Sequence, residues 1–171
     1  MDLEVTRPAF ERYGKEVIKQ ARANLTRKDM NVTRELYRSL KFALTVSSNS
    51  VEQRFTSSRW GAFQDLGVKG TESSQRAPNS PFQFKSKMIP WQPIIKWVTA
   101  RKIQFRTTSG QFMSYRSTAF LIARSIPRKG LKATQFFSRP ARRRGEILSE
   151  ELFETLNIDF GNFVAKLQEE R

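Results

Sequence analysis

The stretch LYRSLKFALTVSSNSVEQRFT, residues 36–56, contains the pattern on which the predicted fold rests. Toward the end of residues 36–46, apolar side chains alternate with polar or small ones, which is typical of a strand with one buried face. The segment SSNS (47–50) supplies a turn, and VEQRFT (51–56) alternates again. The pattern therefore predicts an antiparallel hairpin with a short loop.

Helical periodicity predicts a helix on each side of this hairpin. Before it, residues 8–26 repeat apolar side chains at helical spacing, and Pro8 suits the first turn because its missing N–H is not needed there. After it, SSRWGAFQDLG (57–67) is typical of a short helix. We expect Ser57 or Ser58 as its N-cap, Gly67 as its stop, and an inward face of Trp60, Phe63 and Leu66.

Two further helices are predicted in the second half of the chain, at residues 90–103 and 117–130, with a loop at 103–115 between them. The first would turn one apolar face inward, made of Trp91, Ile94, Ile95 and Val98. The cap of the second is expected at Ser117 or Thr118, and its end at Pro127 and Gly130.

The last part of the chain predicts a change from extended to helical structure. Residues 133–140 are expected to form a short strand or an extended edge, because Pro140 restricts Arg139 to extended backbone. Residues from 141 onward are expected to be helical, with a break at Asn157.

The fold class predicted from these elements is α+β. An antiparallel sheet built on the hairpin would be packed by the long N-terminal helix and by further helices. The length suits one domain over residues 1–171. Its expected parts are a body at about 8–66 and 88–140, an extended interface arm at 67–87, and C-terminal helices at 141–171.

The composition excludes several kinds of chemistry. The chain has no Cys and no His, which removes disulfides, thiolate catalysis, zinc–thiolate sites and an imidazole base for a serine nucleophile. Carboxylates such as Glu35, Glu52 and Asp65 are scattered along the sequence. We therefore expect a protein that is not an enzyme, with no catalytic, metal-binding or cofactor-binding residues and no cofactor.

The N-terminus lacks the basic region and apolar core of a secretory signal, and no apolar stretch approaches the ~20 residues that cross a bilayer. We expect a soluble protein that makes no membrane contact and is compatible with a reducing cytosol.

The net charge of +15 is distributed unevenly. Residues 85–144 carry 15 Lys and Arg and no carboxylate, whereas residues 145–171 carry 2 basic and 7 acidic residues. The basic segment needs counter-charge from ions, a polyanion or acidic protein surfaces. Non-specific nucleic-acid binding and solvated helix faces are both compatible with this pattern. The acidic end suits either head-to-tail contact between copies, which can close into a ring, or pairing within one subunit.

The loop GVKGTESSQRAPNSPFQF, residues 67–84, is longer than most connections inside a domain, which have ~4–6 residues. The spacing of Gly67, Lys69 and Gly70 does not fit a phosphate-binding loop. An interface arm is the interpretation we favour over an exposed loop or an interdomain linker. The predicted interface residues, from this arm and from the charged tail, are Pro81, Phe82, Phe84, Arg139, Arg142, Arg143, Arg144, Glu150, Glu151 and Glu154.

Over roughly residues 10–145, the chain resembles the tail-completion or head–tail joining proteins of tailed bacteriophages. The resemblance rests on the order of short motifs: a strand start, an aromatic-Gly-x-Phe turn after the hairpin, and a Phe/Pro segment before the last helix. These correspond to Leu36, Ser39 and Leu40; to Trp60, Gly61, Phe63 and Gly67; and to Phe136, Phe137 and Pro140. The loop after Gly67 is longer than in minimal members of that family, and Gln-Phe-Phe stands where Pro-Phe is common.

The resemblance implies a non-enzymatic structural protein of the virion, located where the neck meets the tail and in the host cytoplasm during assembly. It implies a ring-forming subunit, six-fold or alternatively twelve-fold. The implied partners are an adaptor, stopper or portal-side neck protein and the major tail tube protein, with non-specific contact to genomic DNA in the channel. The alternative function is a non-specific nucleic-acid-binding module.

Overall fold

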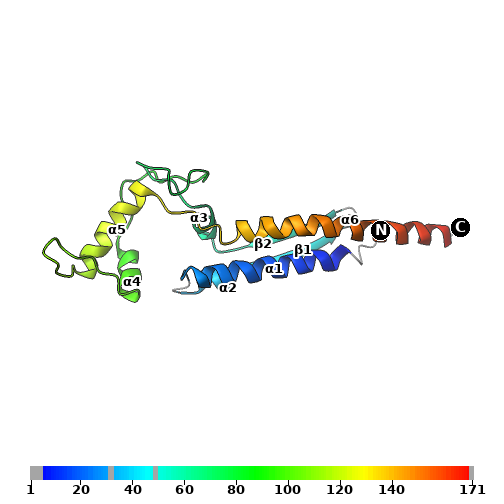
Figure 1. Ribbon diagram of the computed structural model, residues 1–171, viewed down its shortest axis with the longest axis horizontal. Helices are drawn as coiled ribbons and strands as arrows, with labels where there is room; N and C mark the ends of the chain where they lie inside the picture. The colour runs from blue at the N-terminus through cyan, green and yellow to red at the C-terminus, as the bar shows by residue number, and fades with distance from the viewer. Residues whose placement is uncertain (1–5, 31–32, 48–49, 170–171) are drawn as a thin grey trace. The chain divides into compact units, whose positions relative to one another are not determined.

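The computed structural model describes residues 6–30, 33–47 and 50–169 (Figure 1). Among these residues six helices and one two-stranded antiparallel sheet confirm the predicted α+β class. The elements are α1 (Thr6–Arg27), α2 (Glu35–Ser39), β1 (Lys41–Ser47), β2 (Ser50–Thr56), α3 (Gly61–Leu66), α4 (Gln92–Ala100), α5 (Tyr115–Lys129) and α6 (Ser138–Glu169). The chain divides into two compact units: the first is Met1–Ser58 with Phe136–Arg171, and the second is Arg59–Gln135.

The hairpin of the first unit confirms the prediction, with Lys41 opposite Thr56 and Ser47 opposite Ser50. The strand begins at Lys41 rather than at Leu36, because the residues before it form the short helix α2. Leu36 is buried there, with only 2% of its surface exposed, so it already belongs to the core. A single helical turn, not an extended strand, is what brings Leu36 inside.

The core of the first unit lies between α1, the hairpin and the start of α6. The predicted helix at 8–26 is confirmed as α1, whose buried side chains include Val17, Ala21 and Leu25. Phe55 of β2 makes edge contacts with Tyr13 of α1 and with Phe137, at centroid distances of 5.9 and 5.2 Å. Helical spacing on α1 and alternation on β2 therefore meet in one aromatic cluster.

Helix α6 corrects two predictions. Residues 133–140 contain no strand, and Arg139 lies in the first turn of the helix, where the following Pro140 needs no intrahelical N–H bond. The helix also continues through Asn157 without a break. Packing against α1 on both sides of this position outweighs the weak helix propensity of asparagine.

One carboxylate on α6 caps α1. Asp159, which is 2% exposed, accepts the backbone N–H of Thr6 at 3.0 Å and its hydroxyl at 2.6 Å. The N–H groups in the first turn of a helix have no intrahelical partner, and the positive end of the helix dipole favours a carboxylate there. The contact joins residues 153 positions apart and fixes the end of α1 against α6.

We expect Asp159→Ala to lower the free energy of unfolding of the first unit by about 1–3 kcal/mol, because both acceptor bonds are lost at a buried position. Asp159→Asn keeps an acceptor oxygen and should lose less. Chemical denaturation followed by the helical circular dichroism signal measures both. Asn162→Ala, at an exposed position on the same helix, is the matched control. An Asp159→Ala protein as stable as this control would contradict the capping role.

The second unit contains α3, α4 and α5, and α4 and α5 pack against each other. Both predicted helices are present with different ends. Helix α5 begins earlier, because Ser114 is its N-cap and accepts the N–H of Ser117 at 3.1 Å. Thr118 is instead fully buried and accepts the N–H of Phe105 at 3.2 Å. Gly130 ends the helix as predicted, and Pro127 lies inside it.

Helix α3 also differs from its prediction. Its N-cap is Trp60, and neither Ser57 nor Ser58 caps it. Gly67 ends it as expected. Phe63 and Leu66 are 39% and 38% exposed, so its predicted inward face is wrong for these two side chains. In the part of the chain that the structure describes, no helix is both long enough and apolar enough to cross a membrane.

Candidate assembly surfaces

Helix α6 carries seven of the predicted interface residues, and the structure separates them into two groups. Arg144 and Glu151 face α1 and are half-buried. The other five are exposed and make no ion pair with any described residue; they are Arg139, Arg142, Arg143, Glu150 and Glu154. Only this second group is available to another molecule in the isolated chain.

Arg144 and Glu151 hold α6 against α1 within one subunit. Arg144 pairs with Glu16 at 3.4 Å, and Glu151 pairs with Arg12 at 3.3 Å. In the orientation that satisfies both groups, the amide oxygen of Gln20 also accepts two bonds from Arg144, each at 2.8 Å. Both partners belong to α1, so these two pairs do not join the basic segment 85–144 to the acidic end 145–171. A contact of these two residues with a neighbouring copy stays a prediction.

The long loop of residues 67–84 folds onto the end of α5. Val68 forms a bridge with Leu131, and Lys69 exchanges backbone bonds with Phe82 and Phe84, at 2.8 and 3.0 Å. The hydroxyl of Ser80, which is buried, donates to the Gly67 carbonyl at 2.7 Å. The segment is thus built into the second unit by its backbone.

The three predicted anchors of this loop lie near one another along it. Pro81 is exposed, whereas Phe82 and Phe84 are half-buried. The ring of Phe82 contacts that of Phe63 edge-on at a centroid distance of 4.6 Å. This contact leaves Phe63 39% exposed, so the pair presents aromatic surface to solvent. A role of these anchors on a neighbouring copy stays a prediction.

An ion pair ties the loop to α5. Glu72 accepts from Nε of Arg128 at 2.7 Å, and the backbone N–H of Thr71 donates to the Pro127 carbonyl at 2.8 Å. The hydrogen bond from Arg128 lowers the pKa of the Glu72 carboxyl below its usual value. Because the pKa of Glu72 is lowered in the folded state, its carboxylate stays charged and paired with Arg128 at a lower pH than an unpaired glutamate would.

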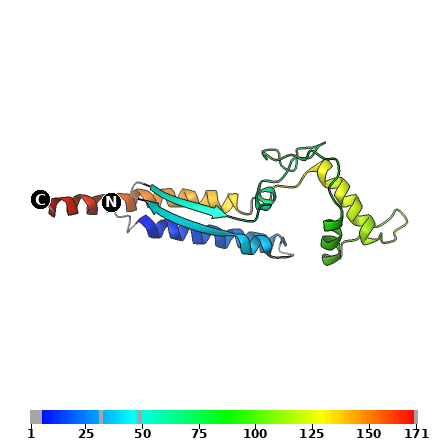
Figure 2. The ribbon, with the colours of Figure 1, turned by 180° about the vertical axis from the view of Figure 1, so that it is seen from behind.

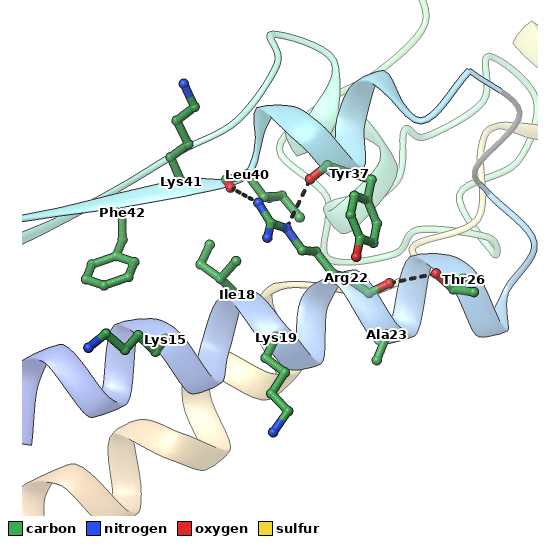
Figure 3. A pocket seen from close by; sticks show the side chains of 10 residues that line it. All are labelled: Lys15, Ile18, Lys19, Arg22, Ala23, Thr26, Tyr37, Leu40, Lys41 and Phe42. Carbon is green, nitrogen blue, oxygen red and sulfur yellow. Dashed lines mark hydrogen bonds between the residues drawn. The ribbon is translucent and has the colours of Figure 1, made fainter.

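A groove in the first unit lies between α1 and the segment formed by α2 and the start of β1 (Figure 3). Its volume is about 640 Å³, within the range of ~300–1,000 Å³ typical of pockets that hold drug-sized groups. Its lining contains four basic and no acidic side chains. The lining residues are Lys15, Ile18, Lys19, Arg22, Ala23, Thr26, Tyr37, Leu40, Lys41 and Phe42.

The groove is apolar at its floor and basic at its rim. Arg22 spans it, donating to the carbonyls of Tyr37 and Leu40 at 3.2 and 3.0 Å, and its guanidinium lies 5.1 Å from the Tyr37 ring centroid. Figure 3 shows Lys15, Lys19 and Lys41 extending away from one another around the floor. These amines do not converge on one point, and the Arg22 guanidinium is already bonded to two carbonyls. The arrangement therefore suits a broad acidic and apolar surface better than a single small anion.

The C-terminal half of α6 carries an apolar stripe that faces solvent. Phe153 is 78% exposed, Leu156 42%, Phe160 59% and Phe163 36%. These positions repeat at alternating intervals of three and four residues, which places them on one side of a helix and is typical of a helix–helix seam. Contiguous exposed apolar surface of this kind marks an interaction site.

The sequence-based interface residues did not include this stripe or the groove. The stripe could have been predicted from the sequence, because Phe153, Leu156, Phe160 and Phe163 recur at intervals of three and four residues. The groove had none, because Lys15 and Lys19 are far in sequence from Lys41 and only folding brings them to one site.

The second unit combines positive charge with exposed aromatic rings. Residues 59–135 contain 14 Lys and Arg and 2 Asp and Glu, a net charge of +12. The guanidinium of Arg106 lies 4.2 Å from the ring centroid of Phe112, which is 63% exposed, and that of Arg116 lies 5.2 Å from Trp91. Cations beside accessible rings are the elements of a surface that can bind phosphates and stack on bases.

Comparison of the chain with protein-family models, with curated proteins and with solved structures gives no match. Within the described residues, no group of three or more carboxylates is placed to hold a metal ion.

Proposed function

We propose that this protein is a structural component of a tailed-bacteriophage virion, a head–tail joining or tail-completion protein that acts by shape and charge and carries out no catalysis. Copies would form a ring, six-fold or alternatively twelve-fold, between an adaptor, stopper or portal-side neck protein and the major tail tube protein. The ring would assemble in the host cytoplasm and remain at the junction of neck and tail.

The observation that carries the proposal is the order of the family-like motifs on the elements of this fold. The motif of Leu36, Ser39 and Leu40 leads from α2 into the hairpin. The motif that ends at Gly67 forms α3 and its C-cap directly after the hairpin. Motifs that lie where one element ends and the next begins support the proposal better than the same residues scattered within elements would.

The exposed surfaces also support a protein that is completed by neighbours. Among the residues that the structure describes, fifteen large apolar side chains are at least 36% exposed, and they occur in both units. The second unit cannot neutralise its own positive charge, since it has only two carboxylates. Protein neighbours would cover the apolar groups and neutralise part of this charge. Basic side chains that line a channel would contact DNA non-specifically, and tight gripping would oppose its passage.

Mass spectrometry of purified virions tests the proposal directly. We expect the chain to be present at a ratio of copies that matches a ring, and electron microscopy of the same particles to show density at the neck–tail junction when the chain carries a tag. Sizing of the purified protein with and without the tail tube protein adds a test of partnership. Absence from the virions of a phage that encodes the chain would refute the proposal.

The second candidate function is a non-specific nucleic-acid-binding module, which the +12 charge and the Arg106–Phe112 pair favour. It predicts binding to duplex of any sequence, with affinity falling ~10³-fold or more between low and moderate salt when six or more phosphates are contacted. The variant Lys96→Glu, Arg106→Glu, Arg116→Glu separates the functions, because all three side chains are exposed and belong to the basic second unit. Loss of DNA binding with assembly intact would favour the module, and the reverse result would favour the joining protein.

A further inference from the structure

We propose that the apolar stripe of α6, defined as Phe153, Leu156, Phe160 and Phe163, docks into the basic-rimmed groove between α1 and β1 of a second copy of this chain. The inference adds detail to the proposed ring. It rests on the proposed function in one respect only, which is that copies of the chain associate. It assigns the partner surfaces, which neither the motifs nor the charge distribution specify.

The two surfaces are complementary in charge. Glu150 and Glu154 are exposed and lie one helical turn apart beside the stripe, so a helix inserted through this face brings carboxylates along its flank. The groove presents Lys15, Lys19 and Lys41 around an apolar floor and has no acidic residue in its lining. Lys15 and Lys19 also pair with Glu11 and Glu16 of α1 at 3.7 and 3.8 Å, but these pairs are long and exposed, so they contribute little and leave the amines able to exchange partners. An acidic amphipathic helix is the occupant that fits a basic rim and an apolar floor together.

The stripe is also large enough to contribute to a specific interface. Phe153, Phe160 and Phe163 are 78%, 59% and 36% exposed, which corresponds to on the order of 350 Å² of accessible aromatic surface. A standard interface covers ~800 Å² on each partner. Three aromatic anchors would therefore supply almost half of one side, and their flanking residues the rest.

The geometry of the first unit requires that the two surfaces meet between copies. Asp159 contacts Thr6 at the beginning of α1, and α6 continues beyond this point, as Figures 1 and 2 both show. The groove begins at Lys15 and extends to Thr26, so its middle lies ~22 Å from Thr6 along α1, in the opposite direction. A rigid helix cannot fold back over that distance. One copy thus offers a stripe at one end and a groove toward the other, which makes a heterologous contact that can close into a ring.

Two full-length variants test the contact by complementation. The stripe variant carries Phe153→Ser and Phe160→Ser, and the groove variant carries Lys15→Glu, Lys19→Glu and Lys41→Glu. Each variant alone should be monomeric in sedimentation velocity at concentrations where the unaltered chain associates. Their equimolar mixture should form a one-to-one dimer and nothing larger, since it retains one intact stripe and one intact groove per pair. Lys85→Glu with Lys132→Glu, two exposed positions of the second unit, is the matched charge control and should associate normally.

Crosslinking keeps the test decisive if a substitution disturbs folding. The chain has no cysteine, so single cysteines introduce the only thiols. Ala23→Cys lines the groove and is exposed, and it should crosslink through a short bis-maleimide to a second chain that carries Phe160→Cys. A Thr108→Cys chain, exposed in the second unit, should give no such product with Ala23→Cys.

The outcomes distinguish this contact from other arrangements and from the proposed function. Continued association of the groove variant by itself would show that association does not need the groove and would overturn the inference. A mixture that stays monomeric although both chains are folded would also overturn it. An unaltered chain that never associates overturns the contact, while the proposed function is decided separately by the presence of the chain in virions.

Discussion

Replacing Gly67 by alanine is expected to destabilise the second unit by about 3 kcal/mol or more. Gly67 has φ 74° and ψ −176°, a combination that is essentially restricted to glycine and costs other residues ~1–3 kcal/mol. A Cβ at this position would also lie 2.6 Å from the carbonyl oxygen of Leu131 and 2.7 Å from the backbone nitrogen of Ala133. Both neighbours are backbone atoms next to the Val68–Leu131 bridge, so relief requires that the bridge itself opens.

Tryptophan fluorescence measures this effect specifically. The three tryptophans of the chain, at positions 60, 91 and 97, all belong to the second unit. Denaturant unfolding of Gly67→Ala followed by this signal should show a lower midpoint with an unchanged slope. Gly110→Ala is the matched control, because Gly110 also has a positive φ, 84°, but has open space where its Cβ would stand. Equal losses for the two variants would show that strain alone, and not the close approach to Leu131, sets the cost.

The second large effect is expected for Leu25→Ala in the first unit, at about 2–5 kcal/mol. Leu25 has no exposed surface and lies on the inward face of α1. Truncation removes its transfer free energy and leaves a cavity that packed neighbours fill only partly. The helical circular dichroism signal during denaturation measures the loss, since α1 and α6 belong to this unit.

Leu156→Ala is the control for this prediction, because it makes the same chemical change on α6 at a side chain that is 42% exposed. We expect it to change stability by less than about 1 kcal/mol in dilute solution. At higher concentration the same variant should weaken association between copies. A stability loss as large as that of Leu25→Ala would mean that Leu156 contributes to the core and not to a docking surface.

Parts of the fold with a self-contained local pattern could be predicted from the sequence. The hairpin and α1 each rest on a periodicity that tertiary contacts reinforce, so both were confirmed. Helix α2 was missed because Leu36 satisfies a strand pattern and a helical turn equally well. Only its burial, and the bonds from Arg22 to the carbonyls of Tyr37 and Leu40, select the turn.

Helix caps and faces were harder to predict because several residues compete for each role. Ser114, Ser117 and Thr118 are all suitable N-caps, and the choice among them depends on Thr118 being buried against the N–H of Phe105. Phe63 looked like a core residue by spacing, yet its ring packs on Phe82 and stays partly exposed. Such outcomes follow from contacts between segments that a local pattern does not contain.

The candidate surfaces could be predicted only in part for the same reason. The sequence identified the charged residues of α6 but could not divide them into paired and exposed groups. Arg144 and Glu151 find partners on α1, whereas Arg142 and Glu150 point elsewhere on the same helix. Whether a charge is available to a partner depends on its angular position relative to α1, which folding alone defines.

The division of the chain also determines the order in which the units can be completed on the ribosome. The first unit consists of both ends of the sequence, and the second is inserted between them. Residues 59–135 emerge together and can reach their final structure while synthesis continues. The apolar face of α1 must wait for α6, and its cap waits for Asp159, which is translated 153 residues after Thr6. Until then the face of α1 that packs on α6 has no partner, so premature termination near residue 135 would release a chain with a complete second unit and an incomplete first unit.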